Sequence, residues 1–157
     1  MYKFLFVALS LAALGYANTP DEAFDRLVNA MYSGNAEVVR TCLSTESIAL
    51  VDMMLMMIKA QPEDAAAEIS AELKVPISSE ELRSWTSLDL IDAVLASPML
   101  QSELPPRDDI VFTGAEVFGD SCMVSFNVGD YPEPFNLLMV KNGEEWKVDQ
   151  SVVQAEL

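Results

Sequence analysis

The sequence predicts an α+β fold in which N-terminal helices pack on a C-terminal four-stranded antiparallel meander sheet. Apolar residues recur every three or four positions over residues 20–97, a spacing typical of amphipathic helices. After Pro105 and Pro106 the spacing changes to strict alternation with turn signals at short intervals, which indicates strands. We therefore expect residues 18–104 to be mainly helical and residues 105–157 to be mainly strand.

The first residues have the features of a cleavable signal peptide. Lys3 precedes an apolar run over residues 4–14, and the small residues Gly15 and Ala17 follow it. A run of about 11 apolar residues is too short to cross a bilayer core, which takes about 20. We expect residues 1–17 to be removed on export, leaving a soluble periplasmic or extracellular protein with no membrane span.

The remaining residues, 18–157, have the length of a single globular domain. Loss of Lys3 changes the net charge from −16 to −17, which repels nucleic acid and anionic lipid and disfavours both as partners. Apolar residues make up 51% of the chain, which argues against disorder.

Start and stop signals divide the helical part into short helices. Thr19 and Glu22 form a capping box, and Gly34 ends the first helix because a left-handed residue is favoured there. Asn35 and Ser78 are suited to cap later helices. We expect helices at about residues 20–33, 36–43, 46–60, 62–73, 79–85 and 88–96.

Four strands are predicted at about residues 109–118, 121–128, 134–141 and 145–152. The pair Asn142 and Gly143 is a strong hairpin signal because both residues tolerate positive φ. One sheet face collects Ile110, Phe112, Cys122, Val124, Phe126, Val128, Phe135, Leu137, Met139, Trp146 and Val148. The first helix is expected to cover that face.

The other sheet face is too apolar to be fully solvated. It mixes Val111, Val117, Met123, Leu138 and Val140 with polar residues. Either the central helices or a second copy of the protein could cover it.

Cys42 and Cys122 are the two cysteines of the chain. In an oxidising compartment they could form one disulfide, and as residues of apolar faces they could instead be two buried free thiols. Both alternatives stay open, with the disulfide preferred.

The layout resembles the nuclear transport factor 2-like superfamily, in an exported subgroup without known chemistry. Residues 23–44, with their long helix, glycine break and short second helix, carry the resemblance, and residues 135–149 are similar to the family's closing hairpin. The resemblance implies a cone made by a curved sheet around the first helix. Residues 46–97 depart from the pattern, since they are predicted to be nearly all helix.

The resemblance also provides a check on catalysis. Isomerase-type members carry a tyrosine where this chain has Leu27, and their carboxylate base has its nearest counterpart in Asp52. Dehydratase-type members rely on histidine, which this chain lacks. We expect no catalytic residue of either kind.

Other chemical signatures are also missing from the sequence. Without histidine there is no Ser-His-Asp or Cys-His catalysis, and two cysteines cannot form a thiolate metal cluster, so no metal and no cofactor is expected. The methionines in residues 53–57 could offer sulfur to Cu(I), but they point around a helix, so we expect them to pack in a core or line a groove.

Two classes of function follow. The first is a non-enzymatic exported domain that binds a small apolar ligand or a protein partner, with Asn127, Tyr131, Asn136 and Asp52 as the candidate pocket residues. The second is an isomerase-like or dehydratase-like enzyme that uses carboxylates alone, and it requires a buried Asp52. A structural homodimer is a third possibility.

Overall fold

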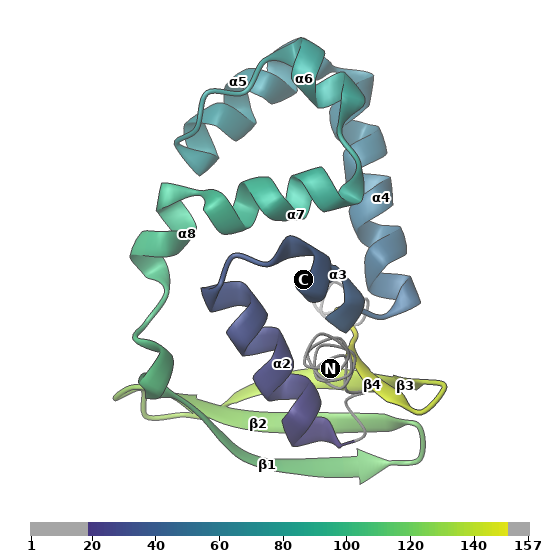
Figure 1. Cartoon of the computed structure of the whole chain (residues 1–157), viewed down its shortest axis with the longest axis vertical. Coiled ribbons are helices and arrows are strands. Elements are labelled where there is room, and N and C mark those ends of the chain that lie inside the picture. Colours follow the sequence, from purple (N-terminus) through teal and green to yellow (C-terminus); the bar gives the residue numbers. More distant parts are fainter. Residues whose placement is uncertain (1–18, 151–157) are drawn as a thin grey trace, which may run out of the picture.

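The computed structural model describes residues 19–150 and confirms the predicted fold class. Within these residues, helices come first and a four-stranded antiparallel sheet follows (Figure 1). The helices are α2 (Pro20–Tyr32), α3 (Ala36–Cys42), α4 (Thr45–Ala60), α5 (Pro62–Leu73), α6 (Ser79–Ser84), α7 (Ser87–Ala96) and α8 (Pro98–Glu103). A 3-10 turn, η1 (Arg107–Asp109), leads into the strands β1 (Ile110–Phe118), β2 (Ser121–Val128), β3 (Phe135–Asn142) and β4 (Glu145–Val148). The predicted signal peptide lies outside the described residues.

The helix boundaries follow the local signals with one exception. Thr19 and Glu22 form the predicted capping box, and Gly34 has a φ of 65°. The sequence does not predict helix α8, because a proline after residues 88–96 is expected to end a helix. In the structure Pro98 is instead the first residue of a new helix, and Ser97 caps it by accepting a hydrogen bond from the Leu100 N–H.

The strand order is β1-β2-β3-β4, as predicted for a meander, but the register of β1 shifts along its length. The shift lies between Phe112, which pairs with Phe126, and Gly114, which pairs with Ser125. A β-bulge of this kind adds one residue to a strand and reverses the side on which the following side chains lie. Val117 therefore pairs with Cys122 on the helix-covered face, and its predicted place on the opposite face is wrong.

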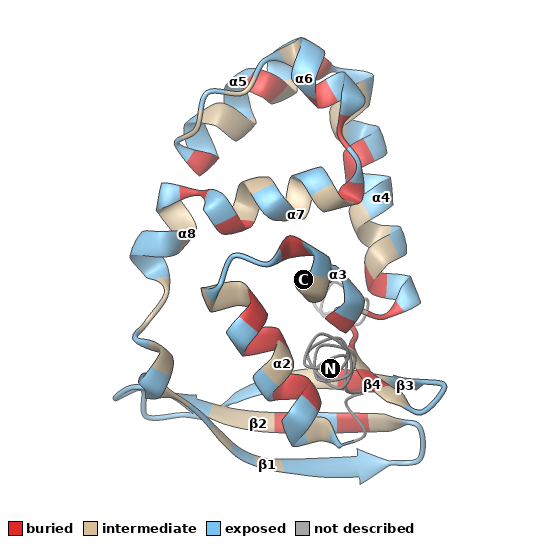
Figure 2. Ribbon diagram, in the orientation of Figure 1, coloured by how far each residue is buried: buried red, intermediate tan, exposed pale blue. Residues whose placement is uncertain are grey.

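A first core lies between α2 and the sheet. Phe24 is 2% exposed, and its ring centroid lies 5.9 Å from that of Phe112 and 5.0 Å from that of Phe126. Cys122, Val124 and Met139 of the sheet are fully buried in the same cluster. Figure 2 shows buried segments, in red, on both α2 and β2. The first helix thus covers the apolar sheet face, as predicted.

A second, smaller core holds the outer helices together. Leu55 of α4, Ala66 of α5, Leu82 of α6 and the side chain of Trp85 form it. Helix α7 joins the two cores, since it contributes the buried Leu95 to the first and packs Leu90 and Ala93 against the second. We call helices α4, α5, α6 and α7 the helical lobe.

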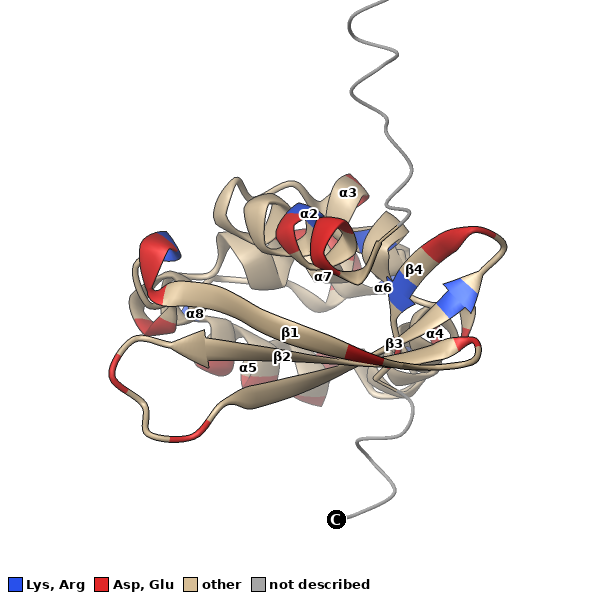
Figure 3. Cartoon of the chain, turned by 90° about the horizontal axis from the view of Figure 1, so that it is seen from below, with Lys and Arg blue, Asp and Glu red and all other residues tan. Residues whose placement is uncertain are grey.

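The opposite face of the sheet has no covering helix within residues 19–150. Figure 1 shows the helices on one side of the sheet, so the central helices do not cover this face. Val111 and Phe118 of β1 are 50% and 60% exposed, and Met123 of β2 is 37% exposed. Charged side chains are few along β1 and β2, where Glu116 is the single one (Figure 3).

Candidate functional site

Helix α4 has apolar residues on all sides, although the helices of residues 19–150 that contact it lie on the side of Leu55. Leu55 is 6% exposed and packs in the second core, whereas Met53, Met54, Met56 and Met57 are 51%, 48%, 73% and 69% exposed. At 3.6 residues per turn these four side chains occupy an arc of about 160° on the helix. We call them the methionine face.

The exposure of the methionine face contradicts the sequence-based expectation for these residues. These side chains were expected to pack in a core or a groove, but α5, α6 and α7 contact α4 from the side of Leu55, and the methionines point away from that core. In the described part of the chain, the methionines on the far side of α4 therefore remain exposed.

The composition of α4 is unusual for a surface helix. Its 16 residues contain three charged side chains, Glu46, Asp52 and Lys59. A helix that is apolar all round is ordinarily buried, and contiguous exposed apolar residues ordinarily mark an interaction site. Methionine suits such a surface because its unbranched, polarisable side chain adapts to differently shaped partners.

A buried polar cluster fixes the start of α4 to the end of the sheet. The Ser44 hydroxyl accepts a hydrogen bond from the Ser47 N–H at 3.0 Å and so caps the helix, while the Ser44 N–H donates to the Val148 carbonyl at 2.7 Å. The Ser47 hydroxyl donates to the same carbonyl at 3.2 Å and accepts from the Gln150 N–H at 2.8 Å. Ser44 and Ser47 are 1% and 3% exposed, so these bonds are shielded from water.

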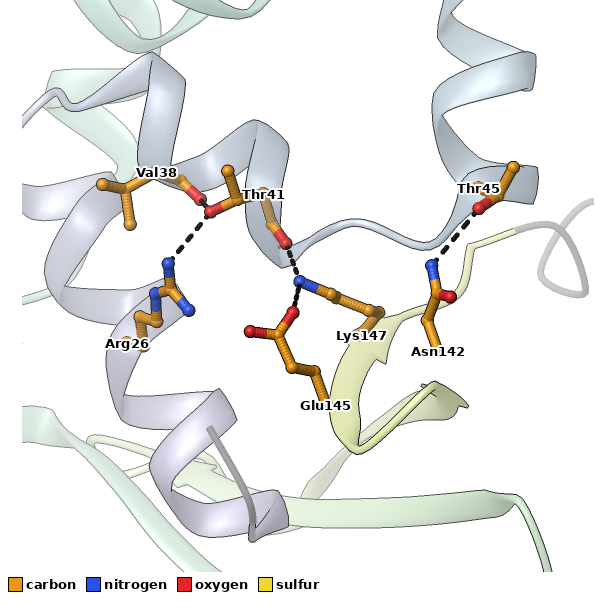
Figure 4. A network of polar contacts seen from close by, with 7 residues as sticks. All are labelled: Arg26, Val38, Thr41, Thr45, Asn142, Glu145 and Lys147. Atoms are coloured by element: carbon orange, nitrogen blue, oxygen red, sulfur yellow. Dashed lines mark hydrogen bonds and ion pairs between the residues drawn. The ribbon is translucent and has the colours of Figure 1, made fainter. Parts of the chain in front are cut away.

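A second set of polar contacts joins α3 and α4 to the strands β3 and β4 (Figure 4). The Lys147 ammonium donates to the Thr41 carbonyl at 2.6 Å and pairs with Glu145, which ties α3 to the edge strand. The Asn142 amide donates to the Thr45 hydroxyl at 3.4 Å. This last contact places the β3–β4 turn, which contains Glu144, beside the first turn of α4.

Acidic groups lie at both ends of α4. Glu46 and Glu144 are near its start, Asp52 borders the methionine face, and Asp64 follows its end in the first turn of α5. Within residues 19–150 none of these four carboxylates forms an ion pair, whereas the nearby Glu63 pairs with Arg83. The methionine face is therefore an apolar surface with a negative border.

The structure separates the four residues predicted to share a pocket. Asn127, Tyr131 and Asn136 lie at the end of the sheet that contains the β2–β3 turn, and all three are exposed. Asp52 is on α4, which adjoins the β3–β4 turn at the other end of β3. The grouping is wrong because opposite ends of one strand cannot line one cavity mouth.

Tyr131 itself lies at a shallow hollow. With Asp130 and Pro132 it lines an open space of about 270 Å³, and its ring makes an edge contact with Phe135 at a centroid distance of 5.7 Å. Asn136 accepts a hydrogen bond from the Ser125 hydroxyl at 2.8 Å and so has a structural partner. The hollow is open and small, and three consecutive residues form its lining.

The carboxylate that a catalytic hypothesis requires is not buried. Asp52 is exposed on α4, and an exposed carboxyl lacks the apolar surroundings that adapt such a group to proton transfer. Leu27, at the position of the isomerase tyrosine, is a buried residue of the first core. Neither position therefore provides an acid or base inside the fold.

The preferred disulfide is not formed. Cys42 and Cys122 are both free and buried, and burial raises the pKa of each thiol above its ordinary value. Leu43, next to Cys42, pairs with Val148 on β4, and β3 separates that strand from β2. Three strand spacings amount to about 14 Å along the sheet, beyond the roughly 7 Å that a disulfide spans between Cα atoms.

A larger cleft lies between the α2–α3 turn and α7. It is open, has a volume of about 460 Å³, and contains the carboxylates of Glu37, Asp89 and Asp92. Asp89 caps α7 together with Thr86, and the hydrogen bond from the Thr86 hydroxyl holds the pKa of this carboxyl below its usual value. Among residues 19–150 no group of three or more ligating side chains is arranged to hold a metal ion.

Comparisons with protein-family models, with curated proteins and with solved structures find no match for this chain. Within the part of the chain that the structure describes, no helix has both the length and the apolar character needed to cross a membrane.

Proposed function

We propose that this chain is an exported, non-enzymatic protein-binding domain and that the methionine face of α4 is its binding surface. One observation carries the proposal: four adjacent methionines, each about half exposed or more, on a helix that has apolar residues on every side. Their exposure to water is unfavourable by roughly 25 cal/mol for each Å² of apolar surface, so covering them with a partner stabilises the complex.

A protein partner is favoured over a small apolar ligand. Phe24, Leu27 and Met139 occupy the space between α2 and the sheet, where a ligand would have to bind. The two open spaces described above lie outside this core, and the larger has an acidic lining. An apolar ligand gains little from such surroundings.

We also propose a distant relationship to the nuclear transport factor 2-like superfamily. The support is the order of a long first helix, a glycine break at Gly34, a short second helix and a sheet that packs on the first helix. The helical lobe is an addition to that plan, and the proposed binding surface belongs to this addition.

Site-specific photocrosslinking in cells that produce the chain naturally tests the proposal. A benzoylphenylalanine at Met57 should give discrete adducts of higher mass, because this side chain points to solvent on the binding surface. The same group at Glu80, an exposed residue of α6, serves as the control. Equal adducts at both positions, or none at Met57, would refute the proposal.

A homodimer is the second candidate, and the open sheet face favours it. Val111, Phe118 and Met123 are exposed there, and Glu116 is the single charged residue of β1 and β2, so two acidic chains could approach with little repulsion. Light scattering of residues 18–157 should then give twice the monomer mass, and a Phe118→Glu variant should give the monomer mass. A monomer at micromolar concentration for the unaltered chain would exclude this candidate.

A further inference from the structure

We infer that the segment bound by the methionine face is a cationic amphipathic helix of the partner. This inference rests on the proposed function and specifies the chemistry of its partner. Three features carry it: the shape and length of the face, the charges around it, and the kind of side chain that forms it.

The shape of the surface fits a helix. Helix α4 has 16 residues and is therefore about 24 Å long. Met53 and Met57 are one turn apart, and Met56 is adjacent, so they form a ridge along the helix rather than an enclosed pocket. A second helix packs naturally against such a ridge at an axial distance of about 8–10 Å. The four methionines span residues 53–57, a little more than one turn, so the apolar contact of the partner would extend over about one to two turns.

The charges select a positive partner. Residues 45–103 contain 11 Asp and Glu against 3 Lys and Arg. Glu46 and Glu144 lie at one end of α4, Asp64 lies at the other end, and Asp52 lies along the border. Lysines or arginines beside the apolar stripe of a partner would meet these carboxylates, whereas acidic residues there would be repelled. Complementary charges of this kind raise association rates and exclude wrong partners.

The methionine side chains allow the face to bind a range of partner sequences and not one sequence alone. Methionine has three rotatable bonds and a polarisable sulfur, so the same face can accommodate leucine, phenylalanine or isoleucine stripes. Helix-in-groove recognition depends on apolar anchors at positions i, i+3, i+4 and i+7. We therefore expect tolerance toward the apolar residues of the partner and strong discrimination by its charge.

Two synthetic peptides of 18 residues test the inference against the whole mature chain, residues 18–157. Both carry leucine along one helical face; the first carries lysine on the opposite face and the second carries glutamate. Fluorescence anisotropy measures binding of each labelled peptide at low and at physiological salt. The lysine peptide should bind, with affinity that falls as salt increases, and the glutamate peptide should not bind.

Variants of the chain distinguish the methionine face from general attraction by a negative protein. Met56→Gln with Met57→Gln should lower the affinity for the lysine peptide by at least about 30-fold, because two apolar anchors are lost. A border variant that combines Glu46→Gln, Asp52→Asn, Asp64→Asn and Glu144→Gln should lower it about 10-fold. A matched variant with four remote charges removed, at Asp108, Glu116, Asp130 and Glu133, should change it less than 2-fold.

The outcomes separate the inference from the proposed function. If both peptides bind equally and the Met56/Met57 variant abolishes binding, the charge inference is wrong and the methionine face remains the binding surface. The inference fails if the Met56/Met57 variant binds the lysine peptide with unchanged affinity. It also fails if the remote variant weakens binding as much as the border variant does. The inference is also overturned if neither peptide binds, or if the chain binds phosphatidylcholine vesicles and neither peptide. The proposed function itself fails if the Met57 crosslink in cells is absent or is matched by the Glu80 control.

Discussion

Replacing Ser44 by alanine tests how α4 is fixed to the sheet. The Ser44 hydroxyl caps the helix by accepting from the Ser47 N–H, and it also lies 3.1 Å from the Ser47 hydroxyl and 3.4 Å from Asp149 Oδ1. All three residues are buried. The alanine variant therefore loses a helix cap and a shielded hydrogen-bonding group together.

The expected loss of stability has two parts. Removal of an N-cap serine costs about 1 kcal/mol. Removal of a buried hydrogen-bonding partner, which leaves polar groups with fewer bonds, costs about 1–3 kcal/mol more. We expect the Ser44→Ala variant to have a free energy of unfolding that is about 2–4 kcal/mol lower than that of the unaltered chain.

A matched variant separates the stability loss due to the buried hydrogen bonds from the loss due to the helix cap. Ser78 caps α6 by accepting from the Glu81 N–H at 3.2 Å, but Ser78 is exposed, so Ser78→Ala should cost only the cap, about 1 kcal/mol. Urea unfolding of residues 18–157, followed by circular dichroism, measures both values. Equal losses for the two variants would show that the cluster around Ser44 does not stabilise the fold as described.

Three further predictions concern the thiols, one helix cap and one turn. Cys42 and Cys122 should titrate as two free thiols per chain in denaturant and should react slowly in the native protein, because both are buried with raised pKa values; a count of zero would mean that the disulfide forms. The lowered pKa of Asp89 means that its charge stabilises the fold above the ordinary pKa of a carboxyl. The deficit in free energy of unfolding of Asp89→Asn at pH 7 should therefore shrink as the pH falls below about 4, and a deficit that does not change with pH would contradict this. Gly34→Ala should lower the free energy of unfolding by about 1–2 kcal/mol, because a residue with a Cβ is strained at a φ of 65°. A Cβ at this position meets no atom within 4 Å, so no steric clash adds to this cost. An unchanged midpoint of urea unfolding would contradict the left-handed turn.

The periodicity of apolar residues is sufficient to predict most of this fold. The change from helical to alternating spacing after Pro106 marks the boundary between helices and strands, and Asn142 with Gly143 marks the last hairpin. The bulge after Phe112 could not be predicted, because the apolar pattern of β1 is compatible with two pairing registers, one with an inserted residue and one without. Helix α8 was missed because a proline can end one helix and begin the next.

The functional site was only partly predictable. The methionines of residues 53–57 are conspicuous in the sequence, but a sequence does not state on which sides a helix has neighbours. The exposure of Met56 and Met57 depends on α5, α6 and α7 all packing on the side of Leu55, and this is a property of the tertiary structure. The pocket prediction failed for a similar reason, since Asp52 belongs to the helix beside the β3–β4 turn and Tyr131 to the β2–β3 turn, at the other end of β3.

Methionine oxidation most directly tests the claim that a partner covers the methionine face, because other methionines of the same chain serve as controls. Brief peroxide treatment of the purified chain, followed by peptide mass spectrometry, should oxidise Met56 and Met57 first, the 37% exposed Met123 more slowly, and the fully buried Met139 last. The same treatment of intact producing cells should show Met56 and Met57 protected relative to Met123, because a partner covers the methionine face. Equal oxidation of Met56 and Met57 in the purified chain and in cells, each compared with Met123, would contradict the proposal that this face binds a partner.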